Sequence, residues 1–269
     1  MVQGTAPHGA QAVWRALAIL GVFTDERPTW TLAELARDQR LSKPTALRIL
    51  GALEQAGFLA RSGPAGSYRL GTAAIELGAR AQRATSVSAA ARPELESLAR
   101  ETGETSSLEI LHRGETLILD EVHGQHLVGT APSIGMRWPA HATSTGKVLL
   151  AAARDGSLEP SQVLQGSADA ATLKRLTERT ITARPALDAE LDRVTDQGHA
   201  TVVGELEPDF VAIAAPVRNH QGQVVAAISV GGPASRLRAD ARQRIIRLVV
   251  QSAGRASERL GYLPAGNRR

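Results

Sequence analysis

Basic side chains are concentrated in the segment between positions 40 and 69. Five residues of this segment are basic, namely Arg40, Lys43, Arg48, Arg61 and Arg69. Glu54 is the only acid in the same segment. A local positive stripe is typical of a surface that contacts phosphate groups, and an arginine can also donate two hydrogen bonds to a guanine edge. The segment therefore favours recognition of a nucleic acid.

A second stretch with chemical potential runs from position 143 to 147 and is rich in serine, threonine and glycine. It precedes a predicted helix, so its free backbone N–H groups could bind an anion such as a carboxylate. Ser144 or Thr145 could instead simply cap that helix. A phosphate-binding loop is excluded, because that motif requires glycine where His141 stands and serine or threonine where Val148 stands.

Catalytic chemistry is disfavoured by incomplete motifs. Ser229 resembles the serine of a hydrolase nucleophile elbow, but Ala227 replaces the first glycine and no histidine follows the serine. His123 and His126 are spaced to share a metal ion, yet no carboxylate or cysteine cluster joins them. We therefore predict that the chain is not an enzyme and has no catalytic residue, no metal site and no cofactor.

Two short helices are predicted to position the basic residues. Thr31 and Glu34 form a capping box that begins the first of them, and residues 38–41 form a turn. Ser42 is the predicted N-cap of the next helix, with Pro44 in its first turn and Gly57 at its end. This pattern is typical of a helix-turn-helix, in which the second helix enters the major groove.

The faces of these helices follow from the spacing of their apolar residues. Leu47, Leu50 and Leu53 recur every three residues and are predicted to face inward with Ile49. Before them, residues 11–23 form a predicted helix whose apolar stripe contains Trp14 and Leu17. Two predicted strands, 58–61 and 67–70, follow as a wing, in which Tyr68 could pack on the sheet or touch DNA. The predicted DNA-binding residues are Ser42, Lys43, Pro44, Thr45, Arg48, Arg61, Ser67 and Arg69.

The remainder of the chain alternates between helical and strand periodicity. Helices are predicted over 72–88, 93–102, 173–179, 187–197 and 240–260, and residues 140–153 are predicted to be a loop that leads into a helix. Strands are predicted over 106–112, 115–122, 125–130, 200–203, 211–218 and 223–230. Such an order indicates an α+β domain with an antiparallel sheet. The helix over 72–88 has only a thin apolar stripe, which suggests a connector between two domains.

Bulk composition supports a packed protein of the cytoplasm. The 269 residues are 43% hydrophobic and 22% charged, with a net charge of +4, a pI near 10.1 and no cysteine. No disulfide framework is therefore expected. We find no signal-peptide pattern, and the apolar runs are too short to cross a bilayer.

Several motifs together resemble the IclR family of bacterial transcription regulators. The N-terminal blocks are 12–20, 32–36, 43–58 and 68–71, and the C-terminal blocks are 139–151, 204–205, 213–217 and 226–233. The resemblance covers about residues 11–262. It implies a winged helix-turn-helix over 11–71, a linker helix over 72–88 and a GAF-like effector-binding domain over 89–262, flanked by a disordered arm (1–10) and a tail (263–269).

The resemblance also implies a mode of action. A homodimer or a dimer of dimers would bind a double-stranded DNA operator and respond to a small-molecule effector, more commonly as a repressor than as an activator. The alternative is a small-molecule-binding protein or enzyme whose N-terminal helices only form a dimerisation scaffold. The basic helix and wing favour the regulator.

The effector pocket departs from that of family members that bind small oxo-acids. Where those members have a polar residue, a cysteine and a serine, this sequence has Val202, Ala212 and Gly231. We therefore expect a roomier, more apolar pocket that takes an aromatic or otherwise apolar organic acid. Leu127, Val128 and Trp138 could form its wall or belong to the core. The predicted effector-binding residues are Leu127, Trp138, Ser144, Thr145, Gly146, Val202, Ala212, Ser229 and Gly231.

Overall fold

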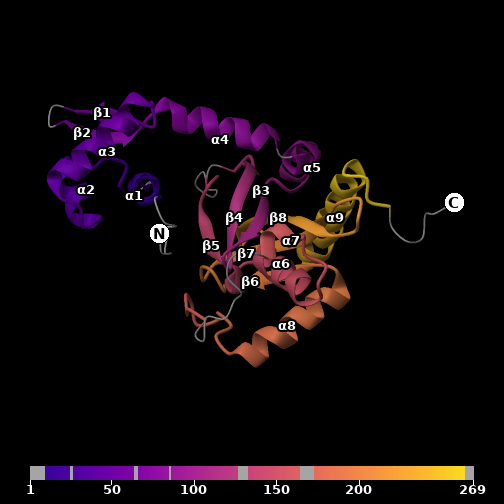
Figure 1. Ribbon diagram of the computed structural model, residues 1–269. Coiled ribbons are helices and arrows are strands. Elements are labelled where there is room, and N and C mark those ends of the chain that lie inside the picture. The colour runs from indigo at the N-terminus through magenta and orange to yellow at the C-terminus, as the bar shows by residue number, and fades with distance from the viewer. Residues whose placement is uncertain are drawn as a thin grey trace. The chain divides into compact units, whose positions relative to one another are not determined.

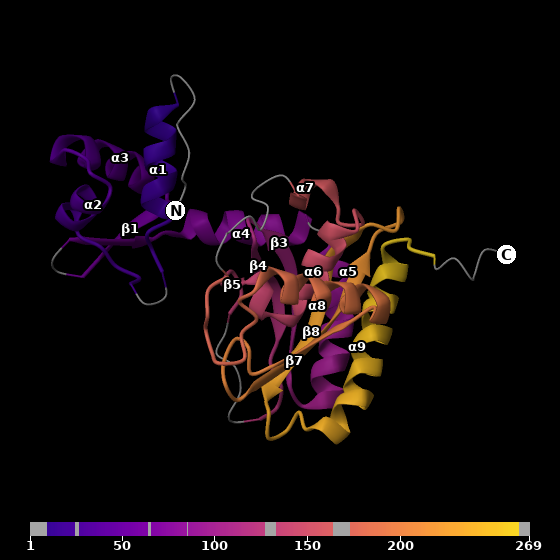
Figure 2. The same ribbon diagram turned by 90° about the horizontal axis from the view of Figure 1, so that it is seen from below.

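The computed structural model describes residues 10–24, 27–63, 66–84, 86–126, 133–163 and 173–263. The chain consists of two units, residues 1–84 and 85–269 (Figures 1 and 2). The predicted arm 1–10 lies almost wholly outside the described residues, and so does the tail. No helix in the described ranges is long and apolar enough to cross a membrane.

The first unit is a winged helix-turn-helix. Its elements are α1 (Gln11–Leu20), α2 (Leu32–Asp38), α3 (Lys43–Gln55), β1 (Leu59–Ser62), β2 (Ser67–Leu70) and α4 (Thr72–Ala84). The capping box forms as predicted, because the Thr31 hydroxyl accepts from the Glu34 N–H while the Glu34 carboxylate accepts from the Thr31 N–H at 2.8 Å. Gly57 adopts a positive φ of 74° directly after α3, where a side chain would be strained.

A small core holds the first unit together. Ile19, Leu35, Leu50 and Leu59 are fully or almost fully buried in it. Tyr68 is also completely buried and its backbone pairs with that of Trp30, which assigns this tyrosine to packing and excludes it from contact with DNA. The core therefore fixes the angle between α3 and the wing.

Two predicted apolar faces are wrong. Leu17 and Leu47 are both 51% exposed, although the spacing placed each of them in a buried stripe. In α1 the buried residue is Ile19, with Ala16 and Leu20 packed partly against the core. In α3 the inward face runs through Ala46, Leu50 and Leu53, so Leu47 lies on the outer side of the helix.

The second unit contains a six-stranded antiparallel sheet in the order β5-β4-β3-β8-β7-β6. The strands are β3 (Thr105–His112), β4 (Glu115–Val122), β5 (Arg137–Pro139), β6 (Ala200–Val203), β7 (Phe210–Arg218) and β8 (Val224–Pro233). Helices cover both faces of this sheet (Figure 2). The helices are α5 (Ser86–Thr102), η1 (Ala140–Ala142), α6 (Ser144–Arg154), α7 (Pro160–Val163), α8 (Arg184–Gln197) and α9 (Ala239–Arg259).

The two faces of the sheet have different surroundings. Leu108, Ile213 and Ile228 point to the side of α5 and α9, where they join Leu95 and Val249 in the larger apolar core. Because side chains alternate along a strand, the intervening residues of β3, β7 and β8 point to the side of α6. Part of that second side is packed with apolar residues of α6 and α8, and part of it is hollow.

Three predicted elements of the second unit are wrong. Helix α5 begins at Ser86 and continues through Pro93, where the sequence predicted a helix start. Gln125 and His126 are not in a strand, and the rest of the predicted strand 125–130 lies outside the described residues; the edge strand is β5.

The third wrong prediction is the helix over residues 173–179, which form no helix in the structure. The Thr177 and Thr180 hydroxyls bind the carbonyls of Gly204 and Glu205 at 2.6 and 2.8 Å, and Thr180 also accepts from the Thr177 N–H. Such side-chain bonds compete with helical hydrogen bonding.

Candidate functional site

The outer face of α3 is the first candidate site. Ser42 caps the helix and its hydroxyl pairs with that of Thr45 at 2.9 Å. Lys43, Pro44 and Arg48 are exposed beside this cap. Within the described part of the chain, Lys43 and Arg48 make no ion pair or hydrogen bond. Two cations are thus presented to solvent near a helix N-terminus, which itself carries partial positive charge.

Leu47 completes this face, and the sequence did not identify it. It lies one turn after Lys43 and next to Arg48 on the exposed side of α3. An apolar side chain at this place can contact a thymine methyl group in the major groove. The period of three in the leucines concealed it, because the helix period of 3.6 rotates Leu47 away from Leu50 and Leu53.

The wing residues differ from one another in their availability. The Arg61 guanidinium binds both carboxylate oxygens of Glu54 at 3.1 and 3.3 Å, and it also donates to the Gly66 carbonyl. The hydrogen bond to Glu54 raises the pKa of Arg61. Arg69 is exposed, and among the residues that the structure describes it donates only to the neighbouring Leu70 carbonyl. Arg61 therefore ties the wing to α3, while Arg69 keeps its charge for an outside partner.

The second candidate site is a cavity of about 620 Å3 on the α6 side of the sheet in the second unit. Seven predicted effector-binding residues line it, namely Trp138, Ser144, Thr145, Val202, Ala212, Ser229 and Gly231. Gly146 does not line it; a Cβ there would come within 2.1 Å of the Ala140 carbonyl oxygen, so this glycine permits close packing of η1 on α6. Leu127 and Val128 lie outside the described residues.

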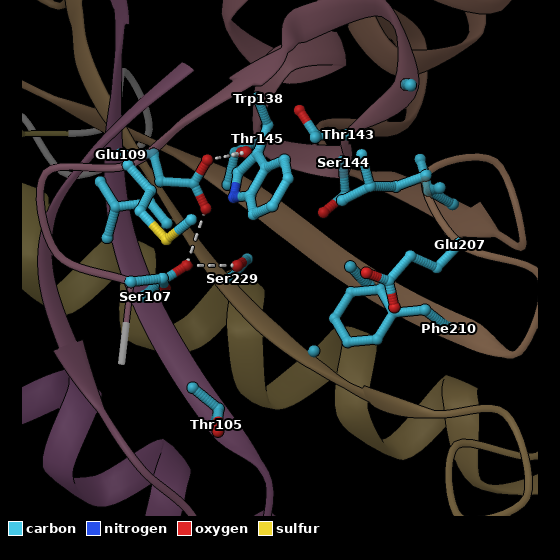
Figure 3. Close-up of a pocket in the computed structure, with 18 of the residues that line it drawn as sticks. Thr105, Ser107, Glu109, Trp138, Thr143, Ser144, Thr145, Glu207, Phe210 and Ser229 are labelled. Atoms are coloured by element: carbon cyan, nitrogen blue, oxygen red, sulfur yellow. Dashed lines mark hydrogen bonds between the residues drawn. The ribbon is translucent and has the colours of Figure 1, made fainter. Parts of the chain in front are cut away.

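The polar floor of the cavity was missed by the sequence reasoning. Ser107 and Glu109 of β3 point into the cavity beside Ser229 of β8 (Figure 3). Glu109 accepts hydrogen bonds from Thr145 at 2.6 Å and from Ser107 at 2.8 Å, and Ser107 and Ser229 are also 2.8 Å apart. Burial raises the pKa of Glu109, and the hydroxyls of Thr145 and Ser107 oppose that rise. The only sequence signal was an unusual number of polar residues in and just before one predicted strand, at positions 105, 106, 107 and 109.

The opposite wall combines aromatic and acidic residues. Phe210 and Glu207 lie across the cavity from Glu109 (Figure 3), and Trp138 also lines the cavity. Asp209 and Glu121 also contribute to the lining. The predicted apolar surface at Val202, Ala212 and Gly231 is thus present, but carboxylates accompany it.

Ser144 presents a hydrogen-bonding group to the cavity. It is only 2% exposed, and its side chain has no partner among the described residues. Its neighbour Thr143 caps α6, because the Thr143 hydroxyl accepts from the Gly146 N–H at 3.0 Å. Capping therefore falls to Thr143, and Ser144 remains available to a ligand.

Lys147 is not available to a ligand. Its side chain is fully buried and its ammonium lies 2.5 Å from Glu205 and 3.6 Å from Glu190. It secures α6 to the loop that follows β6. His123 and His126 pair with different acids, Glu121 and Glu104, and the described residues contain no group of three metal-ligating side chains.

Comparison with known proteins covers both units. Residues 12–63 match the IclR helix-turn-helix domain, and residues 79–258 match the family described as bacterial transcriptional regulator IclR C-terminal. The HTH-type transcriptional regulator XynR of Escherichia coli K12 is 33% identical over 253 residues, which are 94% of this chain and 98% of XynR.

Two further similarities bear on regulation and ligand. The HTH-type transcriptional repressor AllR of Salmonella typhi is 29% identical over 260 residues, covering 97% of this chain and 93% of AllR. The crystal structure of an IclR homolog from Microbacterium hydrocarbonoxydans complexed with 4-hydroxybenzoate superposes with a TM-score of 0.78 at 27% identity, over 93% of this chain and 98% of the other. These curated relatives are transcriptional regulators and not enzymes.

Proposed function

Because this chain belongs to the IclR family of bacterial transcriptional regulators, we propose that it is a ligand-responsive repressor that acts in the cytoplasm. The observation that carries the DNA-binding role is the outer face of α3, where Lys43 and Arg48 are exposed and unpaired within the described chain. The repressor role is supported by the name of the relative AllR.

The DNA contacts divide between bases and phosphates. Arg48 donates to a guanine edge and Leu47 contacts a thymine methyl group, so these two residues read sequence. Lys43 and the hydroxyls of Ser42 and Thr45 bind phosphate oxygens near the start of α3, where Pro44 shapes the first turn. In the wing, Ser67 and Arg69 follow the backbone, and Arg61 supports them through Glu54.

The effector is a small organic acid with an aromatic or otherwise apolar body. A cavity of about 620 Å3 suits a ligand of that size. Trp138, Val202 and Phe210 supply apolar walls, and Ser144 with the start of α6 supplies donors for the acid group. The complex of a relative with 4-hydroxybenzoate supports this class of ligand. Leu127 remains a proposed wall residue.

The active form is a homodimer or a dimer of dimers on a palindromic operator. The two helix-turn-helix units of a dimer would bind half-sites whose centres are about 34–36 Å apart, which is one turn of DNA. Four large apolar side chains of the first unit, Val13, Leu17, Ile75 and Leu77, are more than half exposed, which supports burial against a second copy. The dimer would have one arrangement that binds DNA tightly and another that binds it weakly. An effector can change DNA affinity only by the difference between its own affinities for these two arrangements, typically about 1–3 kcal/mol.

A gel-shift titration tests the proposal. The double-stranded DNA upstream of the gene for this chain is the probe, and it is titrated with and without 4-hydroxybenzoate. We expect retention of this DNA against excess competitor DNA, and release when the acid is added. If no DNA is retained, the protein is a small-molecule-binding module whose N-terminal helices serve only as a scaffold.

A further inference from the structure

The cavity of the second unit is acidic. Four carboxylates line it, from Glu109, Glu121, Glu207 and Asp209, and no lysine, arginine or histidine is among its described lining residues. A site that bound only an anion would be expected to carry the opposite charge. The acidic lining therefore requires a second recognition element besides the acid group.

Glu109 is the most buried carboxylate of this lining. It is 6% exposed, and no cation pairs with it among the described residues. Its carboxylate oxygens accept hydrogen bonds from Thr145 and from Ser107, and the hydroxyl of Thr116 also lowers its pKa. A carboxylate offers about four lone-pair positions, so acceptor capacity remains. A buried carboxylate with unused acceptor positions costs free energy that an incoming donor would recover.

The direction of the hydrogen bonds at the floor is fixed by counting protons. Each hydroxyl has one proton to donate. Ser107 gives its proton to Glu109, so in the contact between Ser107 and Ser229 the donor must be Ser229. Thr145 likewise gives its proton to Glu109. When the Glu109 carboxyl is ionised, every hydroxyl proton of Ser107, Ser229 and Thr145 is donated within the protein, and the cluster presents only acceptors to the cavity.

We propose that Glu109, Ser107 and Ser229 form a subsite for a hydrogen-bond donor, a hydroxyl or amino group carried by the effector. The subsite rests on the proposed effector-binding function and adds a required group to its ligand. The unpartnered Ser144 lies at the start of α6, on another part of the cavity wall, and can receive the acid group (Figure 3). The effector is thus bifunctional, with an acceptor at Ser144 and a donor at Glu109.

The burial that raises the pKa of Glu109 also makes the subsite selective. A ligand donor stabilises the ionised carboxylate, whereas a ligand oxygen without a proton would face acceptors and lose its bonds to water. Sites built to hydrogen-bond a substrate hydroxyl reject analogues that lack it far more strongly than apolar pockets reject a missing methylene. Binding should therefore distinguish probes that differ only in this proton.

Matched probe pairs test the subsite in the full-length protein at pH 7, where the phenolic hydroxyl of each probe keeps its proton. The acid pair is 4-hydroxybenzoate and 4-fluorobenzoate, and the neutral pair is their methyl esters, in which fluorine keeps the size of the hydroxyl without its proton. By calorimetry, we expect each hydroxyl probe to bind about 10- to 100-fold more tightly than its fluoro partner. This ratio is measured on the wild type and needs no variant to fold.

Two variants locate the effect. Glu109→Gln should reduce the hydroxyl-to-fluoro ratio at least about fivefold, because a neutral acceptor forms a weaker hydrogen bond. Ser144→Ala should weaken both acids and leave the ratio unchanged. Equal binding within each pair, or no binding of either hydroxyl probe, would overturn the subsite. A preference seen only in the esters would support the subsite and refute the organic acid of the proposed function.

Discussion

The ring of Phe210 occupies the space beside Gly231 that a side chain at position 231 would need. A Cβ on Gly231 would lie 2.7 Å from Cζ of Phe210, closer than carbon atoms approach in folded proteins, and 3.3 Å from Cε1. The two residues belong to the adjacent strands β7 and β8. Family members that bind small oxo-acids have a serine at this position. Here the Phe210 ring fills the space of that side chain and forms an aromatic wall of the cavity.

Gly231→Ser should therefore displace the Phe210 ring and weaken binding of 4-hydroxybenzoate. Forcing extra atoms into a packed site typically costs about 1–3 kcal/mol, which corresponds to roughly 5- to 150-fold in affinity. Calorimetry measures the change. The double variant Gly231→Ser with Phe210→Ala removes the clash and should regain part of the affinity. Unchanged binding by the single variant would show that the ring does not form the ligand wall.

Arg48→Ala should lower affinity for the operator and relax its sequence preference at one base pair. Loss of a bidentate contact to guanine typically costs about 1–3 kcal/mol. Binding to a set of operator variants, each altered at one position, measures both effects. The matched control is Arg100→Ala, which removes the same charge from an exposed position of α5. If both variants lose affinity equally, Arg48 acts through net charge alone.

Arg69→Ala and Arg61→Ala should affect DNA binding unequally. Arg69 has no ion-pair partner in the described parts of the chain, whereas the charge of Arg61 is compensated by Glu54. Each lost phosphate contact lowers the slope of log affinity against log salt by about 1. Filter binding over a range of salt concentrations should therefore give a reduced slope for Arg69→Ala and a nearly unchanged slope for Arg61→Ala. The reverse order would mean that DNA displaces Glu54 from Arg61.

Glu109→Gln should raise the thermal stability of the ligand-free protein, and more so at pH 8 than at pH 4.5. Burial raises the pKa of Glu109 above its ordinary value of 4.5, so folding favours the protonated form. Its contribution to stability is complete below pH 4.5 and is lost as the pH rises through the raised pKa. Glutamine has no such loss, so the expected gain at pH 8 is about 2–4 °C for each kcal/mol recovered.

Scanning calorimetry at the two pH values measures this difference. Glu207→Gln is the control, because it removes a carboxylate from the same cavity lining at an exposed position. Its effect on melting temperature should depend little on pH. An equal gain for Glu109→Gln at both pH values would contradict the raised pKa.

Lys147→Met should strongly destabilise the second unit. The change leaves Glu205 buried without its cation, and breaking a buried ion pair on one side typically costs about 3–5 kcal/mol. Urea denaturation measures the loss. The double variant Lys147→Met with Glu205→Leu should recover much of it, since both charges are then gone. Failure to recover would assign the loss to packing and not to the unpaired carboxylate.

Local signals predicted much of the fold. The capping box at Thr31, the cap at Ser42 and the glycine at position 57 after α3 each depend on neighbours within a few residues, and each is confirmed. The errors arose where distant contacts decide. Thr177 and Thr180 bind carbonyls of residues 204 and 205, which no window around position 177 contains.

The candidate site was predictable only in part. The sequence motifs identified those cavity residues that lie within blocks resembling the family, such as Ser144 and Ser229. Glu109 was missed because its role depends on the register that sets β3 beside β8, with Ser107 opposite Ser229. Leu47 was missed because a repeat of three residues does not follow the helical turn. Pairing between strands far apart in sequence is not visible in one chain.

Because side chains alternate along β3, β7 and β8, the residues that form the apolar core of the second unit lie on one face of the sheet and the residues that line the cavity lie on the other. Ile213 and Ile228 pack with α5 and α9, while their neighbours Ala212 and Ser229 face the cavity. A single substitution at a cavity position can therefore change the ligand without disturbing the apolar core. Single substitutions can therefore change the ligand specificity of such a domain during evolution, so that relatives with the same backbone respond to different metabolites.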